Sequence, residues 1–236
     1  MAIVAFFDVD QTLISVASMY RFLESYFTAA GTSERYRDVR TRLAAATADG
    51  VPREELNRVL FRALAGEETA AVREAGRRWF AGERDRPGFY HPASVGALAR
   101  HRRAGHRTVL VSGSFPACLA PIADALGVDA VLSATPEHAG GRFTGEIDRP
   151  MIGAAKAVAA QEFTEAESAA LDACWAYGDH ESDLQLLAAV GNPVVVGDDP
   201  LLAGHAARLG WRRLAPSAGF AALDARHSAA KANERK

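Results

Sequence analysis

Residues 6–13 read FFDVDQTL, and this stretch decides how the rest of the chain is interpreted. Residues 3–7 form a short unbroken apolar run, which is typical of a parallel strand buried on both faces. Two carboxylates, Asp8 and Asp10, follow directly where that strand is expected to end. Like charges this close repel each other, so the pair requires a compensating positive charge nearby.

The composition fits a soluble intracellular chain. It has 236 residues, of which 49% are hydrophobic, which is enough for a packed core. The net charge of -2 gives no reason to expect a nucleic acid or an acidic membrane surface as a partner. No apolar run approaches the length of a membrane span, and residues 2–7 are too short for a signal peptide. The two cysteines, Cys118 and Cys174, lack metal-ligand spacing, which indicates buried free thiols in a reducing cytoplasm. The oligomeric state stays open.

After the first strand, the chain changes from a helical pattern to an alternation of strands and helices. Helices are expected near 16–27, 33–48, 52–65 and 67–82, and later near 92–103, 116–126, 152–162, 181–190 and 200–209. Strands are expected at 107–112, 128–132, 172–177 and 193–196, and the pattern is compatible with a hairpin over 136–147 and an edge strand at 211–214. This alternation predicts an α/β core with a parallel sheet flanked by helices.

The helical block interrupts that core directly after its first strand. We therefore expect a discontinuous core, residues 1–14 and 91–236, and an all-helical insertion over 15–90. The polar tail over 228–236 is expected to fray.

Polar side chains follow the predicted strands at their carboxyl ends. The strand at 107–112 ends in Ser112, and the strand at 172–177 is followed by Asp179, with Asp183 one helical turn later. In an open parallel sheet, ligands bind outside the carboxyl ends of the strands. Four carboxylates and one hydroxyl are therefore expected in one crevice: Asp8, Asp10, Asp179, Asp183 and Ser112.

Such a crevice needs positive charge. Two carboxylates about 4 Å apart repel by about 4 kcal/mol at an effective dielectric constant near 20, and several such pairs would exceed a typical folding stability of about 5–15 kcal/mol. Either some carboxyls are protonated or a divalent cation binds among them, and an all-oxygen ligand set points to Mg²⁺. Lys156, near the start of a predicted helix, is placed by chain order to add a second positive charge.

The segment that begins at Ser112 suits a phosphate group. Gly113 lets the backbone approach a ligand closely, and Pro116 is favourable at the first position of a helix. The free N–H groups at that helix start would favour an anion.

Together, these motifs resemble those of the haloacid dehalogenase superfamily, in its phosphoserine-phosphatase-like branch (subfamily IB). The four motifs of that family stand here in order, as Asp8-Val9-Asp10-Gln11-Thr12, VLVSGS with Ser112, GAAKAV with Lys156, and Gly178-Asp179-His180-Glu181-Ser182-Asp183. The resemblance covers most of residues 3–215 and implies a Rossmann-like core with a helical cap inserted after the first strand.

The resemblance also implies a Mg²⁺-dependent phosphatase that acts on a small phosphorylated metabolite through an aspartyl-phosphate. Asp8 would be the nucleophile, and Asp10 would be the general acid and base. The phosphate-binding residues would be Ser112, Gly113, Lys156 and Thr12. The metal ligands would be Asp8, Asp10 through its backbone carbonyl, Asp179 and Asp183.

Three positions depart from the pattern of that branch. Ala17 stands where phosphoserine phosphatases carry a Glu that contacts the amino-acid part of the substrate, and Ser182 stands where they usually carry Asn. Gln11 replaces a small residue, which is not expected to abolish activity. Phosphoserine phosphatase proper and a phosphotransferase with the same intermediate remain alternatives. A phospho-acceptor signalling domain is a further one, which Asp10 and the helical block argue against.

Overall fold

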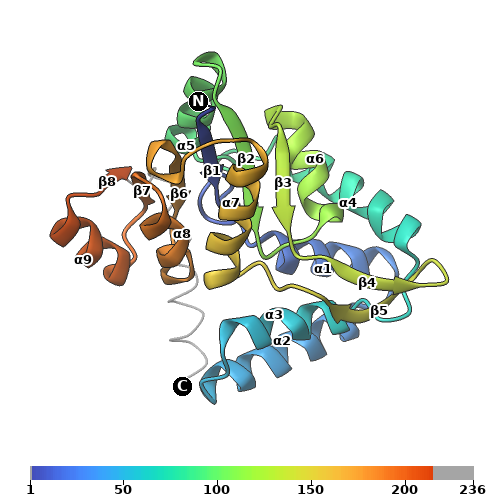
Figure 1. Cartoon of the computed structure of the whole chain (residues 1–236). Coiled ribbons are helices and arrows are strands. Elements are labelled where there is room, and N and C mark those ends of the chain that lie inside the picture. Colours follow the sequence, from blue (N-terminus) through green and yellow to red (C-terminus); the bar gives the residue numbers. More distant parts are fainter. Residues whose placement is uncertain (1, 215–236) are drawn as a thin grey trace.

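The computed structural model describes residues 2–214, and its centre is a sheet of six parallel strands (Figure 1). The spatial order is β3-β2-β1-β6-β7-β8. The strands are β1 (Val4–Phe7), β2 (Arg107–Ser112), β3 (Ala130–Ser133), β6 (Trp175–Gly178), β7 (Asn192–Val196) and β8 (Arg212–Leu214). The predicted α/β class with a parallel sheet is confirmed. The tail that was expected to fray lies outside the described residues.

Helices cover both faces of the sheet, as the alternation predicts. The helices of this part are α5 (Pro92–Arg103), α6 (Pro116–Leu126), α7 (Ala154–Ala166), α8 (Leu184–Ala189) and α9 (Pro200–Leu209). Side chains of α5 and α6 share one apolar cluster with Ala5 and Phe7 of β1, whereas α7, α8 and α9 contribute to a second cluster with Val4 and Phe6. All four residues of β1 are buried, which explains the unbroken apolar run at that strand.

The inserted block contains α1 (Ser18–Ala29), α2 (Ser33–Ala48), α3 (Arg53–Arg62) and α4 (Thr69–Glu83). Figure 1 shows α1 and α3 beyond the end of the sheet toward which the β3 arrow points, with α4 beside α6. The ring of Phe115, just before α6, makes edge-to-face contacts with Phe22 of α1 and Phe61 of α3, with centroids 5.6 and 5.7 Å apart. The inserted helices therefore share a core with one face of the sheet.

The two connections between the sheet and the inserted helices run side by side. The backbone N–H of Ser15 donates to the carbonyl oxygen of Phe89 at 2.8 Å, and the N–H of His91 donates to that of Leu13 at 2.9 Å. The entry and exit segments thus form a small antiparallel pair, which fixes where the inserted helices leave the core.

The sequence-compatible hairpin over 136–147 is present as β4 (Pro136–Ala139) and β5 (Arg142–Ile147). The hairpin bonds to the segment between α3 and α4: the N–H of Gly66 donates to the carbonyl oxygen of Phe143 at 2.8 Å, and the N–H of Phe143 donates to that of Glu67 at 3.0 Å. The hairpin, which comes from the second half of the sequence, is therefore attached to the inserted helices.

Two predicted elements start differently in the structure. Residues Leu171–Ala173 form a 3₁₀ turn, so the strand predicted at 172–177 begins only at Trp175. The helix predicted at 181–190 opens with a 3₁₀ turn, Glu181–Asp183, because the Asp183 carboxylate accepts from the backbone N–H of His180 and tightens the first turn.

A close approach of α4 and α6 gives a test of the packing between the inserted helices and the core. A Cβ on Gly76 would lie 1.9 Å from the carbonyl oxygen of Ala117, whereas a Cβ on Gly82 of the same helix would meet nothing within 4 Å. We expect Gly76→Ala to lower the free energy of unfolding by about 1–3 kcal/mol through overpacking. The matched control, Gly82→Ala, should raise it by up to about 1 kcal/mol through helix propensity. Equal unfolding midpoints in urea for the two variants would contradict this packing.

A buried histidine of α5 should make the fold sensitive to acid. His101 of α5 lies 2.9 Å from the hydroxyl of Tyr177 through Nε2 and 2.8 Å from Nδ1 of His106 through Nδ1. Burial, helped by the charges of His106 and Arg100, lowers the pKa of His101 to about 4. The folded pKa is below the unfolded value of 6.5, so the stabilisation is complete above pH 6.5 and is lost as pH falls toward 4.

We therefore expect His101→Gln to reduce the loss of stability between pH 7 and pH 5 by about 1–2 kcal/mol, at about 1.4 kcal/mol per pKa unit. Gln keeps a hydrogen-bonding group toward Tyr177 and cannot be protonated. His138→Gln is the matched control, because His138 is exposed. Thermal unfolding at the two pH values measures the effect, and a steeper acid loss in His101→Gln than in the control would contradict the assignment.

Candidate active site

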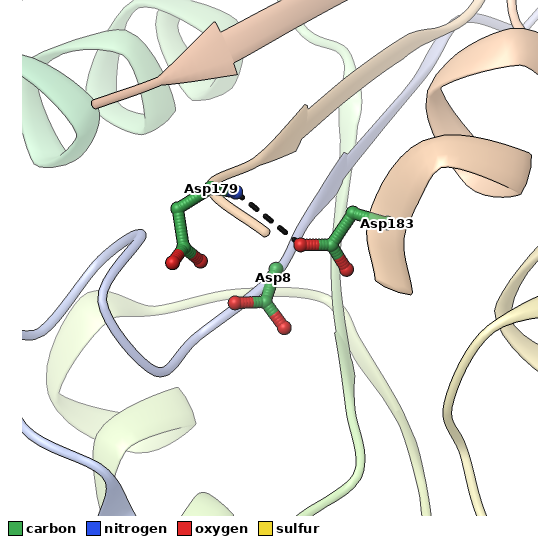
Figure 2. A group of neighbouring side chains, drawn as sticks. All are labelled: Asp8, Asp179 and Asp183. Carbon is green, nitrogen blue, oxygen red and sulfur yellow. Dashed lines mark hydrogen bonds between the residues drawn. The ribbon is translucent and has the colours of Figure 1, made fainter. Parts of the chain in front are cut away.

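Asp8 follows β1 directly and lies in a buried group of three carboxylates. Figure 2 shows it between Asp179 and Asp183, and one carboxylate oxygen from each residue lies within 4.8 Å of the others. Asp179 follows β6, which pairs with β1 in parallel, so both strands deliver their next residue to the same edge of the sheet. The structure brings together these three residues, as the sequence predicts.

Lys156, from the first turn of α7, completes this group. Its ammonium donates to Oδ1 of Asp8 at 2.5 Å and to Oδ1 of Asp183 at 2.6 Å. Only 3% of Lys156 is exposed. Lys156 is therefore a buried ammonium that forms ion pairs with two carboxylates, and it is not a helix lysine exposed to solvent.

The spacing between Gly178, Asp179 and Asp183 in the sequence follows from the geometry of the turn after β6. Oδ2 of Asp183 accepts from the backbone N–H groups of Asp179 and His180, at 3.2 Å each. A Cβ on Gly178 would lie 2.6 Å from Cβ of Asp183, so only glycine permits this approach. Asp183 therefore both orders the turn after β6 and contributes Oδ1 to Lys156.

The electrostatics of the group show a deficit of positive charge. Burial raises the pKa of Asp8 above its usual value, although Lys156 opposes the shift. Burial and the charges of Asp8 and Asp183 raise the pKa of Asp179 well above its usual value. Burial alone would lower the pKa of Lys156, but the two carboxylates it contacts raise it overall. The carboxylates thus favour a further cation at this point.

Thr12 and Gln11 lie in the turn between Asp8 and α1. The hydroxyl of Thr12 donates to Oδ1 of Asp179 at 2.8 Å, so it orients a member of the acidic group, and its expected part in phosphate binding stays a prediction. Gln11 has a φ of 64°, in the left-handed region that favours glycine. This explains in physical terms why Gln is unusual at that position.

Asp10 is not one of the three grouped carboxylates, and it bonds to the inserted helices. Its Oδ2 accepts from the backbone N–H of Ser18, the first residue of α1, at 3.0 Å. Its Oδ1 is buried and has no hydrogen-bond partner among the described residues. Burial and the nearby charge of Asp8 raise the pKa of Asp10 to about 7. A carboxyl group in this state can hold or release a proton near neutral pH.

Ser112 is the last residue of β2, the other neighbour of β1, and Gly113 follows it. Ser112 is 2% exposed, and its Oγ accepts from the backbone N–H of Ser114 at 3.1 Å. A Cβ on Gly113 would lie 2.8 Å from Cγ1 of Ile152, so the loop needs glycine there. Within residues 2–214, no hydrogen bond joins this loop to the three grouped carboxylates, and its expected part in phosphate binding stays a prediction.

Three polar residues of the inserted helices reach this region and were not predicted from the sequence. The hydroxyl of Ser18 donates to that of Ser114 at 2.9 Å, and Nδ2 of Asn57 donates to the carbonyl oxygen of Gly113 at 3.1 Å. The positive charge of Arg53, the first residue of α3, weakly opposes the rise that burial causes in the pKa of Asp8, and it adds to the lowering that burial causes in the pKa of His180. Residues 53–58 read REELNR, which resembles a solvated helix face, so only the fold reveals these contacts.

A family model for haloacid dehalogenase-like hydrolases matches residues 5–188. The chain belongs to this family. The match spans β1 to α8 and so includes every predicted site residue, and the expected family resemblance is confirmed.

The relatives agree with this assignment. A probable phosphatase of Mycobacterium tuberculosis is 31% identical over 212 residues, which are 88% of this chain and 73% of that protein. A crystal structure of a protein of unknown function from Bordetella pertussis Tohama I has a TM-score of 0.78 and 26% identity, and covers 91% of this chain and 99% of its own. A substrate-bound phosphoserine phosphatase has a TM-score of 0.64 at 18% identity, over 86% of this chain and 90% of that one, which shows a shared fold.

No helix within the described residues is both long and apolar enough to span a membrane.

The left-handed backbone at Gln11 leads to a prediction about stability. We expect Gln11→Gly to raise the free energy of unfolding by up to about 1 kcal/mol, because it removes the strain of a side chain at positive φ. Ser168→Gly is the matched control, since Ser168 has a φ of 53° far from the site. Chemical denaturation should show similar gains for both. A loss of stability in Gln11→Gly alone would mean that the Gln11 side chain makes a stabilising contact that outweighs its strain.

Proposed function

We propose that this protein is a Mg²⁺-dependent phosphatase that hydrolyses a small phosphate monoester through an aspartyl-phosphate on Asp8. The observation that carries the proposal is the buried group of Asp8, Asp179 and Asp183 with Lys156 bonded to two of its members. Membership of the haloacid dehalogenase-like hydrolases and the similarity to a probable phosphatase support it.

The donor set fits Mg²⁺. Three ionised carboxylates and one ammonium leave two negative charges, since three minus one is two, and the donors are all oxygens, as Mg²⁺ prefers. Asp8, Asp179 and Asp183, with the backbone carbonyl of Asp10, would hold the ion. When bound, it neutralises the carboxylates and polarises the phosphoryl oxygens.

Asp8 and Asp10 would divide the covalent chemistry. A carboxylate oxygen of Asp8 attacks phosphorus, and the bond from phosphorus to the leaving alcohol oxygen breaks. Asp10 donates its proton to that alcohol, and it then takes a proton from the water that hydrolyses the aspartyl-phosphate. Oδ1 of Asp10 suits this exchange, because it is buried without a partner while Oδ2 is held by the N–H of Ser18.

Lys156, Ser112, Gly113 and Thr12 would surround the phosphoryl group. Lys156 already neutralises Asp8 and would do the same for the phosphoryl oxygens. The start of α6, with Pro116 in its first turn, follows the Ser112 loop, and the positive end of the helix dipole there would favour an anion. Stabilising charge in the transition state is most of the catalysis of phosphoryl transfer.

The inserted helices, residues 15–90, would act as a cap over a core formed by residues 1–14 and 91–236. Hydrogen bonds from Ser18 and Asn57 to the loop after β2 support this role. A cap of this kind excludes bulk water from the aspartyl-phosphate except for the attacking molecule.

Phosphoserine is one substrate to test, because the fold is shared with a substrate-bound phosphoserine phosphatase. Ala17 counts against it, since no acid stands there to pair with an ammonium group. A phosphotransferase would use the same Asp8 intermediate with an alcohol in place of water, and the accumulation of a phosphorylated acceptor would reveal it.

Phosphate release from an aryl phosphate tests the nucleophile. We expect hydrolysis that requires Mg²⁺, stops with a chelator, and falls at least about 1,000-fold in Asp8→Asn, because the amide cannot attack phosphorus. Asp124→Asn, on the exposed surface of α6, is the matched control and should keep full activity. Measurable hydrolysis by purified, folded Asp8→Asn would contradict the assignment of Asp8 as the nucleophile.

A further inference from the structure

Asn57 of α3 is a buried polar residue to which the proposed chemistry gives no task. It is 8% exposed, and its Nδ2 donates to the carbonyl oxygen of Gly113 at 3.1 Å. A carbonyl oxygen can only accept, so the NH₂ group of the amide must face Gly113. The orientation of the amide is therefore determined, and the acceptor atom Oδ1 lies on its other side.

Oδ1 of Asn57 is buried and has no hydrogen-bond partner within the described part of the chain. Buried acceptors are almost always paired in native proteins, so this one requires a donor that arrives from elsewhere. The nitrogen and oxygen of an amide share one carbon, so Oδ1 lies within about 5–6 Å of the Gly113 carbonyl oxygen. The free acceptor is thus close to the loop proposed to bind phosphate.

The neighbours of Asn57 on α3 show which way this face of the helix points. Arg53 and Phe61 lie four residues before and after it and share its face. The ring of Phe61 packs against Phe115, two residues after Gly113, with centroids 5.7 Å apart. The charge of Arg53 opposes, as a minor contribution, the rise that burial causes in the pKa of Asp8. On this face, Asn57 therefore lies between a cation that acts on Asp8 and the ring contact at the start of α6.

We propose that Asn57 determines substrate specificity: its Oδ1 accepts a hydrogen bond from an O–H or N–H group that the substrate carries next to its phosphate ester. The proposal rests on the phosphatase function above and narrows its substrate class. An ester without such a donor would leave Oδ1 buried and unpaired in the closed site, and sites of this kind reject analogues that lack the donor.

Three phosphate esters of nearly equal size test this directly. 2-Hydroxyethyl phosphate carries an O–H donor, 2-aminoethyl phosphate carries an N–H donor, and propyl phosphate carries none. We expect wild-type kcat/KM to be at least 10-fold higher for one of the donor-bearing esters than for propyl phosphate, and the better of the two identifies the donor. Asn57→Leu removes both polar atoms of the side chain. In this variant, kcat/KM for the donor-bearing ester should differ from that for propyl phosphate by no more than about 2-fold.

Asn192→Leu is the matched control. Nδ2 of Asn192 also donates to a backbone carbonyl, that of Cys174 at 3.2 Å, but Asn192 is the first residue of β7 and so lies at the opposite end of that strand from its carboxyl end. It should keep the wild-type ratio. If Asn57→Leu does not fold, Asn57→Ala takes its place. The comparison of the three esters with the wild-type enzyme tests the proposal without any variant.

A wild-type ratio near 1, or no hydrolysis of either donor-bearing ester while an aryl phosphate is hydrolysed, would overturn this inference and leave the phosphatase function intact. The same applies if Asn57→Leu slows all three esters equally and keeps the ratio, since Asn57 would then only support Gly113. Failure of the wild-type enzyme to hydrolyse even the aryl phosphate would overturn the proposed function itself.

Discussion

The buried contacts of Lys156 with Asp8 and Asp183 are the interaction on which the rest of the site depends. An ammonium and two carboxylates are removed from water here beside the partly buried Asp179, and the burial of Asp8 and Asp183 is tolerable only with the ammonium in place. The pairing requires β1 next to β6, and α7 must bring its first turn to their carboxyl ends. The charge pairing in the site therefore depends on the strand order of the sheet.

That requirement explains why much of the site was predictable from the sequence. Asp8, Asp179 and Ser112 each follow an apolar run, and parallel strands direct the residues after them to one edge. Lys156 and Asp183 lie in the first turns of the elements that follow. Such residues are tied to element ends, so local patterns were sufficient to place them. The start of the strand at Trp175 was missed, because a 3₁₀ turn of apolar residues resembles a strand in sequence.

The contacts made by the inserted helices were not predictable in the same way. Asn57 and Gly113 are 56 residues apart, and Ser18 and Ser114 are 96 apart. No periodicity in REELNR distinguishes Asn57, which is buried, from the exposed Glu55 beside it. The same holds for the bonds from the 136–147 hairpin to Gly66 and Glu67, which depend on how two distant segments pack.

This division of the molecule has a consequence for how specificity can change. The groups proposed for covalent chemistry lie mainly at the ends of the sheet strands, and the ammonium paired with them comes from α7 of the core, whereas the Ser18 N–H that holds Asp10 comes from the inserted helices. The side chains that would face the leaving group in the proposed reaction come from the insertion, where Ala17 carries no charge and Arg53 and Asn57 offer a cation and a neutral acceptor. Recognition through a neutral acceptor distinguishes substrates by a hydrogen-bond donor, not by a full positive charge, because an unpaired amide oxygen attracts either an O–H or an N–H group. Substitutions on this face of α3 can therefore alter which ester is used while Asp8, Lys156 and Asp183 keep their contacts.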